Sequence, residues 1–159
     1  MKLIPMTSPT GKQFAMVDDA DFDWLNQWKW RAVSRSGQPT YAMRQTGRKF
    51  IRMHVLVFGD NNPDHIDRNG LNNRRGNLRP ATKSQNGANS KLKKNNTSGF
   101  KGVYWYKAFQ KWTGSIMCNG KRHFTGYFSD AREAARTYDS LSRKLFGKFA
   151  TTNKSLGLL

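Results

Sequence analysis

Apolar and polar positions alternate in short runs along the first third of the chain, up to about Phe58. Runs of this length, separated by turn residues, predict β-strands. Strands are expected at four places: residues 13–17, 27–33, 40–44 and 50–53. The stretch VDDADFDWL predicts one helical turn. Four aromatic side chains are the candidate core of this segment: Phe22, Trp24, Trp28 and Trp30.

From Phe100 onward the pattern is sharper. Three aromatic and β-branched runs predict strands at 100–106, 112–118 and 121–127, and Asn119-Gly120 predicts a hairpin turn between the last two. Apolar residues at helical spacing follow, and Gly147 is expected to end that helix. The pattern therefore predicts a three-stranded antiparallel sheet with one packed helix. The preceding stretch, GANSKLKKNNTSG, has no apolar periodicity and predicts a polar linker.

The middle string PDHIDRNGLNNRRGNLRPATKSQNGAN has a different character. A short strand ends at Asp64-His65, Gly70 marks a turn, and residues 77–79 form a return strand. Thr82 and Gln85 have the spacing of a capping box, so a helix that carries Asn86 is expected to start near Lys83. This order, strand–loop–strand–helix, predicts that Asp64 and Asn86 face each other.

Composition narrows the possible functions. The 159 residues include 28 Lys and Arg against 10 acidic residues, a net charge of +18 that indicates a polyanionic partner. With 36% hydrophobic and 13% aromatic residues, the chain can build small cores. A single cysteine, Cys118, excludes a disulfide framework and a cysteine zinc cluster. No apolar run is long enough for a membrane helix and the N-terminus is too polar for a signal peptide, so a cytoplasmic protein is expected.

The middle string suits metal-assisted hydrolysis of a phosphodiester. Mg²⁺ prefers oxygen ligands, which a carboxylate, an amide and a substrate phosphate would supply, and an imidazole is a suitable base at neutral pH. A calcium loop is excluded because Gly76 stands where a bidentate Glu belongs. The acidic cluster at residues 18–23 is interpreted as an exposed capping and turn cluster rather than a metal site.

The residues Asp64-His65, Asn77 and Asn86, with the flanking NLRPATKSQNGAN, resemble the HNH endonuclease family, in particular the small phage and intron homing enzymes. The resemblance implies that His65 is the general base and that Asp64 and Asn86 bind one divalent ion, Mg²⁺ or Mn²⁺. It also implies that Asn77 ties the hairpin together and helps to orient His65. His54, in the upstream MHVLV, is expected to be a support residue.

Residues 98–153 resemble the plant ethylene-response-factor DNA-binding domain, on the strings SGFKGVYWYKAFQKWTGSI, GKRHFTGYF and AREAARTYDSLSRKLFG. In that family a sheet face enters the major groove of double-stranded DNA. By position, the resemblance implies eight contact residues: Lys101, Tyr104, Tyr106, Lys107, Lys111, Trp112, Lys121 and Arg122. Trp105 and Phe124 are expected to pack against the helix. Tyr104 stands where the plant domain usually has a base-reading Arg, so the plant target sequence does not transfer.

The sequence thus predicts an α+β protein. Residues 1–90 would form a β-rich segment leading into a ββα-metal nuclease motif, 91–98 a linker, and 99–153 the DNA-binding domain. The predicted activity is a homing-type endonuclease that nicks or cuts phage or bacterial DNA in the host cell. Two alternatives are a non-catalytic DNA-binding regulator with a relic nuclease motif and an RNA-binding protein that uses its aromatics for stacking.

Overall fold

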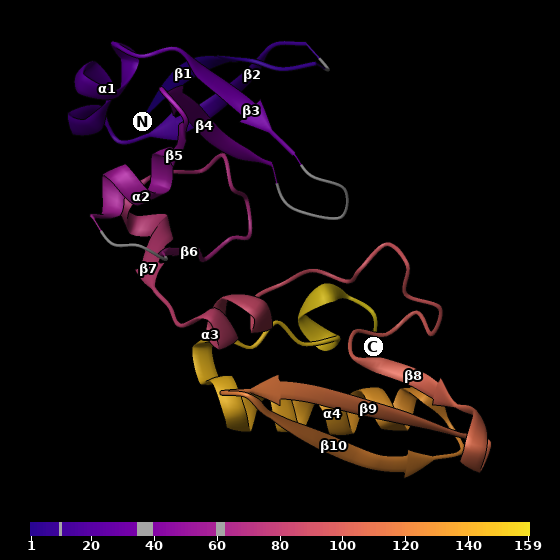
Figure 1. Cartoon of the computed structure of the whole chain (residues 1–159). Coiled ribbons are helices and arrows are strands. Elements are labelled where there is room, and N and C mark those ends of the chain that lie inside the picture. Colours follow the sequence, from indigo (N-terminus) through magenta and orange to yellow (C-terminus); the bar gives the residue numbers. More distant parts are fainter. Residues whose placement is uncertain (10, 35–39, 60–62) are drawn as a thin grey trace. The chain divides into compact units, whose positions relative to one another are not determined.

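A computed structural model describes residues 1–9, 11–34, 40–59 and 63–159 (Figure 1). The chain divides into two compact units, Met1–Ala81 and Thr82–Leu159. The helix expected at the end of the nuclease motif and the stretch 91–98 therefore belong to the second unit, together with the predicted DNA-binding domain. Within the described residues, no helix is long and apolar enough to cross a membrane.

The first unit is built on a five-stranded sheet with the strand order β2-β1-β3-β4-β5. Strand β1, second in this order, pairs antiparallel with β2 and parallel with β3, and the other neighbours are antiparallel. The strands span Lys2–Thr7 (β1), Gln13–Val17 (β2), Trp30–Val33 (β3), Tyr41–Thr46 (β4) and Lys49–Arg52 (β5). The prediction of a β-rich segment is confirmed, although β1 itself was not foreseen.

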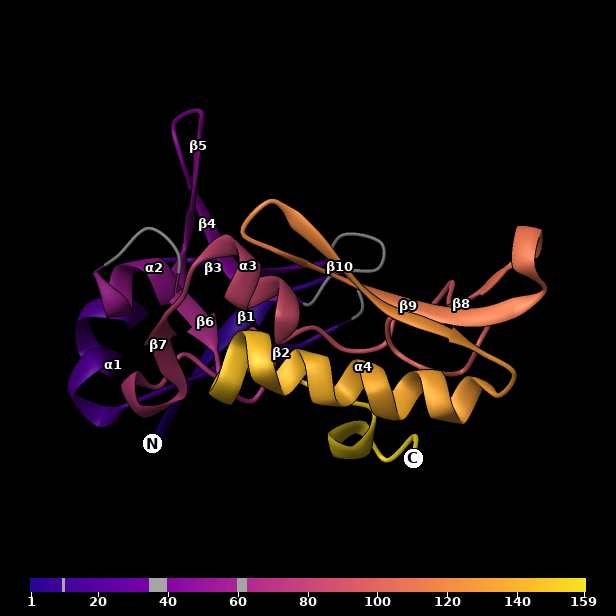
Figure 2. The same cartoon turned by 90° about the horizontal axis from the view of Figure 1, so that it is seen from below.

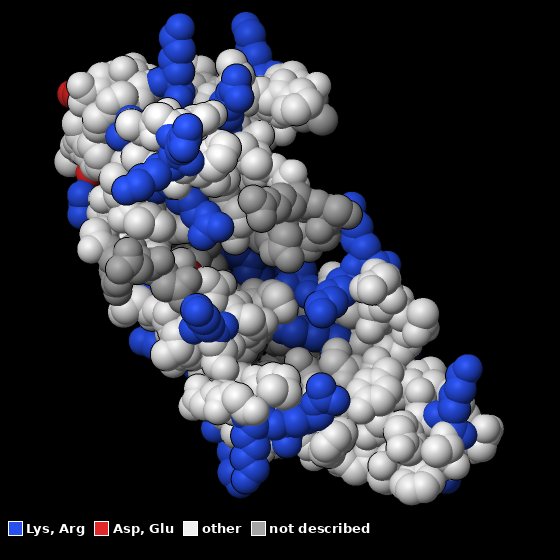
Figure 3. Space-filling model, viewed as in Figure 1, with Lys and Arg blue, Asp and Glu red and all other residues white. Residues whose placement is uncertain are grey.

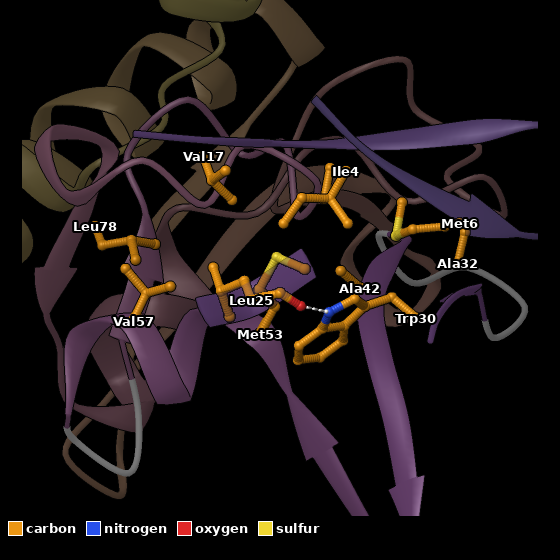
Figure 4. Close-up of a cluster of buried hydrophobic side chains, with 11 residues drawn as sticks. Ile4, Met6, Val17, Leu25, Trp30, Ala32, Ala42, Met53, Val57 and Leu78 are labelled. Carbon is orange, nitrogen blue, oxygen red and sulfur yellow. Dashed lines mark hydrogen bonds between the residues drawn. The ribbon is translucent and has the colours of Figure 1, made fainter. Parts of the chain in front are cut away.

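The core of this unit lies between the sheet and two short helices, α1 (Asp19–Asn26) and α2 (Met53–Phe58). Figure 4 shows Ile4, Val17, Leu25 and Met53 pointing toward one another. Trp30 is 1% exposed, and its indole Nε1 donates a hydrogen bond of 2.9 Å to the carbonyl of Leu25. The buried indole thus keeps its polar atom satisfied, as a tryptophan in a core requires. The other three predicted core aromatics, Phe22, Trp24 and Trp28, pack partly buried against the cluster.

The acidic segment does more than cap a helix. Asp18 accepts hydrogen bonds from Arg74 Nε (3.1 Å) and from the backbone N–H of Arg75 (2.8 Å). Asp21 is buried and accepts from Nε and Nη2 of Arg75 at 2.8 and 2.7 Å. The prediction of an exposed cluster is therefore wrong for Asp21, because its carboxylate anchors the loop that precedes Asn77.

A small hairpin completes the first unit. Strands β6 (Pro63–His65) and β7 (Leu78–Pro80) pair antiparallel, with a short 3-10 helix, η1 (Arg75–Asn77), before β7. The register sets Asp64 opposite Arg79 and His65 opposite Leu78. Leu78 enters the core cluster together with Val57 of α2, so the hairpin is fastened to the body of the unit.

The second unit begins with α3 (Lys83–Ala88), whose predicted capping box is present: Thr82 Oγ1 accepts from the backbone N–H of Gln85, and Gln85 Oε1 accepts from that of Thr82. The three-stranded antiparallel sheet is confirmed, with β9 between β8 and β10 and the helix α4 on one face (Figures 1 and 2). These elements span Val103–Tyr106 (β8), Lys111–Cys118 (β9), Lys121–Phe128 (β10) and Ala131–Phe146 (α4), with short 3-10 helices at Lys107–Phe109 (η2), Gly147–Phe149 (η3) and Lys154–Leu156 (η4).

Candidate functional site

Asp64 and His65 are neighbours on β6, and both are buried, with 4% and 5% of their surface exposed. Adjacent residues of a strand point to opposite faces, so the two side chains have different surroundings. Asp64 faces its cross-strand neighbour: Nε and Nη2 of Arg79 donate to Oδ2 at 2.9 and 2.8 Å. Arg79 is itself only 12% exposed at the side chain. A buried carboxylate needs such a charged partner, and the sequence analysis did not identify Arg79 in this role.

The His65 ring is fixed by packing and by one amide. It lies 4.7 Å from the His54 ring and 5.8 Å from the Tyr41 ring, measured between centroids, and its Nε2 is 3.4 Å from Oδ1 of Asn73. Asn73 Nδ2 donates to the carbonyl of Leu71, which identifies Oδ1 as the atom that faces the histidine. An amide oxygen accepts, so Nε2 carries the proton and the basic lone pair lies on Nδ1. Burial lowers the pKa of His65, opposed by the Asn73 hydrogen bond and the charges of Asp67 and Asp64.

Asn77 closes the loop between the two strands through its side-chain amide. Its Nδ2 donates to Asp67 Oδ1 (2.9 Å) and to the carbonyl of Asn72 (2.8 Å), and its Oδ1 accepts from the backbone N–H of Asp67 (3.1 Å). The direct contact to His65 comes from Asn73. The Asn-rich composition of this loop was the available signal, but it did not single out Asn73.

His54 is buried beside His65 and Tyr41, and its Nδ1 has no hydrogen-bond partner among the residues that the structure describes. Burial, the neighbouring His65 and the charge of Arg52 lower the pKa of His54 to about 3, so the ring is neutral at physiological pH. These contacts agree with a support residue that packs against His65.

The low pKa of His54 predicts acid sensitivity of the fold. In an unfolded chain a histidine titrates near 6.5, so between about pH 6.5 and 3 the unfolded state binds the extra proton. The free energy of unfolding should therefore fall as the pH drops, by about 1.4 kcal/mol for each pH unit below about 6. Urea unfolding at several pH values measures this. His54→Leu should flatten the dependence, and an unchanged slope in that variant would contradict the assignment.

The donor set near Asp64 fits a hard divalent cation with few protein ligands. Within the described ranges, no three His, Cys, Asp or Glu side chains gather closely enough to hold a metal by themselves. A cation would therefore rely on the Asp64 carboxylate, an amide oxygen, water and substrate phosphate, which is a set that Mg²⁺ accepts. Asn86, the expected second ligand, lies half-buried on α3 in the second unit. Its pairing with Asp64 stays a prediction.

Four of the eight expected DNA contacts share one face of the second sheet. On β8, Tyr104 and Tyr106 alternate with the buried Val103, and the register sets Tyr106 opposite Lys111. Arg122 on β10 pairs with Met117, which has the same parity on β9 as Lys111. These four residues therefore point away from the face that α4 covers (Figure 2). Lys107 on η2 and Lys121 at the β9–β10 turn are exposed at the margins of the sheet.

Two of the expected contacts lie elsewhere. Trp112 is on the opposite face by alternation, half-buried, with its ring 5.2 Å from that of Trp105. Lys101 is 7% exposed, and its ammonium donates to the carbonyls of Ala88 (2.6 Å), Ser90 (2.8 Å) and Thr151 (3.0 Å). The expectation that Lys101 contacts DNA is wrong, because three carbonyls already surround its charge.

Two aromatic side chains beyond the eight expected contacts, Phe109 and Tyr127, lie beside Tyr106. The rings of Tyr106, Phe109 and Tyr127 lie within 4.8–5.5 Å of one another, and each ring is at least one-third exposed. Phe124 is 60% exposed and lines a shallow hollow with Thr137 and Leu141 of α4, so its packing against this helix stays a prediction. Trp105 is 41% exposed and contacts Trp112.

Lys101 gives a prediction that separates stability from binding. Lys101→Met should destabilise the protein by about 3 kcal/mol, since it removes the three charge-assisted hydrogen bonds of a buried ammonium. It should leave the salt dependence of DNA binding unchanged at temperatures where the variant is folded. Lys107→Ala and Lys111→Ala should have little effect on stability. Each should lower the slope of log K against log salt by about 0.9. Thermal unfolding and binding titrations test both. If Lys101→Met lowered the salt slope, the conclusion that Lys101 does not contact DNA would be contradicted.

Comparisons with known proteins agree with the HNH resemblance. The chain is 32% identical over 146 residues to a protein of Acanthamoeba polyphaga mimivirus named an uncharacterized HNH endonuclease, covering 89% of this chain and 75% of that protein. It belongs to the HNH endonuclease family. It is also 36% identical over 119 residues to "Protein 3.8" of Escherichia phage T7, covering 68% of this chain and 98% of the phage protein. No protein-family model and no solved structure matches the chain.

Proposed function

We propose that this protein is a metal-dependent endonuclease that hydrolyses phosphodiester bonds of double-stranded DNA. The observation that carries the proposal is the buried Asp64-His65 pair on β6, with the His65 tautomer set by Asn73. His65 Nδ1 would take a proton from a water whose oxygen attacks the phosphorus, and the P–O bond to the leaving oxygen then breaks. Membership of the HNH endonuclease family supports this chemistry.

In this proposal Asp64 and Asn86 hold a single divalent ion, Mg²⁺ or Mn²⁺. When bound, the ion would stabilise negative charge on the phosphate and on the leaving oxygen. Arg79 orients the Asp64 carboxylate through its contacts with Oδ2. Asn73 and Asn77 are positioning residues: the first holds the His65 ring and the second closes the loop behind it.

The second unit would supply much of the affinity and the choice of site, as an ethylene-response-factor-type domain does. Residues 82–159 carry 15 Lys and Arg against 3 acidic residues. On the face of the molecule seen in Figure 3, basic side chains stand out from both units and acidic ones are scarce. The relative from a phage fits a homing-type enzyme that acts on phage or bacterial DNA in the host cytoplasm.

Supercoiled plasmid tests the proposal directly. The full-length protein should convert it to nicked or linear DNA with Mg²⁺ and should leave it intact in EDTA. Mapping the ends on phage DNA would then show whether cutting is site-preferring. Binding of duplex without cleavage at any divalent ion concentration would favour the alternative, a DNA-binding regulator. Preferential binding of RNA would contradict the choice of substrate.

A further inference from the structure

The first unit carries a projecting basic hairpin that the nuclease motif does not account for. Strands β4 and β5 pair from Met43↔Arg52 to Thr46↔Lys49 and are joined through Gly47, at φ +58°, and Arg48. Figure 2 shows the end of this hairpin standing out from the rest of its unit. All residues from 45 to 50 are exposed, so the tip adds nothing to the core. We refer to residues 44–52 as the β4–β5 arm.

Positive charge in the first unit gathers on this arm. The sequence from Trp24 to Gly59 holds seven Lys and Arg and no acidic residue. Four of these cations belong to the arm: Arg44, Arg48, Lys49 and Arg52. Within the described residues, none of the four forms an ion pair. By contrast, three arginines just before or on β7 form ion pairs: Arg74 with Asp18, Arg75 with Asp21 and Arg79 with Asp64.

The arm is shaped for a groove rather than for the interior of the protein. Arg44 is held at its base, with the guanidinium 4.2 Å from the Trp28 ring centroid. Phe50, near the tip, is 64% exposed. A two-stranded ribbon fits the major groove of B-DNA, and an apolar ring flanked by cations suits a surface of base edges framed by phosphates.

The strand that leads into the arm begins next to the proposed catalytic histidine. This strand starts at Tyr41, whose ring is 5.8 Å from that of His65. Gly47 lies six positions after Tyr41 in the sequence. At about 3.3 Å per residue, this corresponds to about 20 Å of strand. That length corresponds to about six base pairs of duplex.

We propose that the β4–β5 arm is a DNA-contacting element of the nuclease unit, which enters the groove about six base pairs from the cleaved bond. Arg48 and Lys49 contact phosphates there, and Phe50 contacts the groove floor. The proposal rests on the proposed function, because the polyanion it names is the substrate of the same unit. It adds a second, independent interface to the one expected on the sheet of the second unit.

The test uses the full-length protein and a duplex that contains a mapped cleavage site, in EDTA so that binding is measured without cutting. Arg48→Ala/Lys49→Ala should lower the slope of log K against log salt by about 1.8, the value for two phosphates. Protection from hydroxyl radicals should be lost about six base pairs from the cleavage position and kept elsewhere. Phe50→Ala should weaken binding without changing the salt slope.

Matched controls come from the same unit. Lys2→Ala/Lys12→Ala removes two exposed cations from the β1–β2 end of the sheet, opposite to β5, and Phe14→Ala removes another exposed phenylalanine, 46% exposed on β2. These variants should keep the wild-type slope and footprint. The proposal is overturned if the arm variant, with an unchanged melting temperature, keeps both as well, or if the controls lose as much slope. If the wild-type protein neither binds nor cleaves duplex DNA, the proposed function fails and the arm proposal fails with it. If the wild-type protein cleaves duplex DNA and the arm variants bind it like the wild type, only the arm proposal is overturned.

Discussion

Replacing His65 with alanine is expected to lower the rate of duplex cleavage by about 10²–10⁴-fold while duplex affinity stays close to that of the wild type. The ring is buried against His54 and Tyr41, and the Asn73 amide fixes its tautomer, so no water molecule can take its place with the same basicity and orientation. Single-turnover nicking of supercoiled plasmid with Mg²⁺ measures the rate, and titration in EDTA measures the affinity.

Two further variants make this result specific. Asn73→Ala should give a smaller loss, since the base remains but its tautomer and orientation are released. His123→Ala, a half-buried histidine on the sheet of the second unit, should cut like the wild type. Full activity of His65→Ala, in a variant that melts like the wild type, would remove His65 from the mechanism.

Asp64→Ala is expected to abolish Mg²⁺-dependent cleavage and also to destabilise the protein by about 3–5 kcal/mol. The first effect follows from losing the carboxylate ligand. The second follows because the guanidinium of Arg79, 12% exposed, is left buried without its counter-charge. Cleavage as a function of Mg²⁺ concentration and urea unfolding measure the two effects separately.

A double variant separates the two roles of Asp64. Asp64→Ala/Arg79→Met removes both charges, so it should recover most of the stability and none of the activity. Arg74→Ala breaks a more exposed ion pair, with side chains 49% and 32% exposed, and should cost no more than about 1 kcal/mol. An Asp64→Ala protein with a normal Mg²⁺ titration and a normal unfolding curve would contradict both assignments.

The elements that sequence reasoning located well are those with local signals. The strand at 13–17 is found at the predicted residues, and the Asn119-Gly120 turn has both residues at positive φ, 49° and 80°. The capping box at Thr82 and the end of α4 at Gly147 are also as predicted. In each case the determining chemistry lies within a few residues of the chain, so a neighbour far away in sequence is not needed to decide it.

Features that depend on distant partners escaped prediction. Strand β1 contains Pro5 and pairs parallel with β3 across 24 residues, so its local pattern says little. The run at 53–58 contains two valines and yet is helical. The sequence did not predict this helix, because periodicity cannot distinguish a short apolar strand from a short buried helix. Lys101 was assigned to DNA by its position in the ethylene-response-factor resemblance, and only the fold shows three carbonyls converging on its ammonium.

In the candidate site, too, the residues that depend on distant partners escaped prediction. Asp64 and His65 were identified from their types and spacing, and the strand that carries them is confirmed. Arg79 and Asn73 could not be identified, because each becomes a partner only through the pairing of β6 with β7 and the path of the loop between them.

The boundary between the units determines where recombination could exchange one unit without breaking the structure of the other. Lys101 ties the segment after α3 to the body of the second unit through Ala88, Ser90 and Thr151, so residues 82–98 are part of that unit's structure rather than a detachable connector. Recombination that joined a foreign nuclease at residue 98 would leave that ammonium without two of its carbonyls. An exchange that begins at Thr82 keeps the unit whole, and it also carries Asn86 along. The unit proposed to select the DNA would then be inherited together with one of the proposed ligands of the metal.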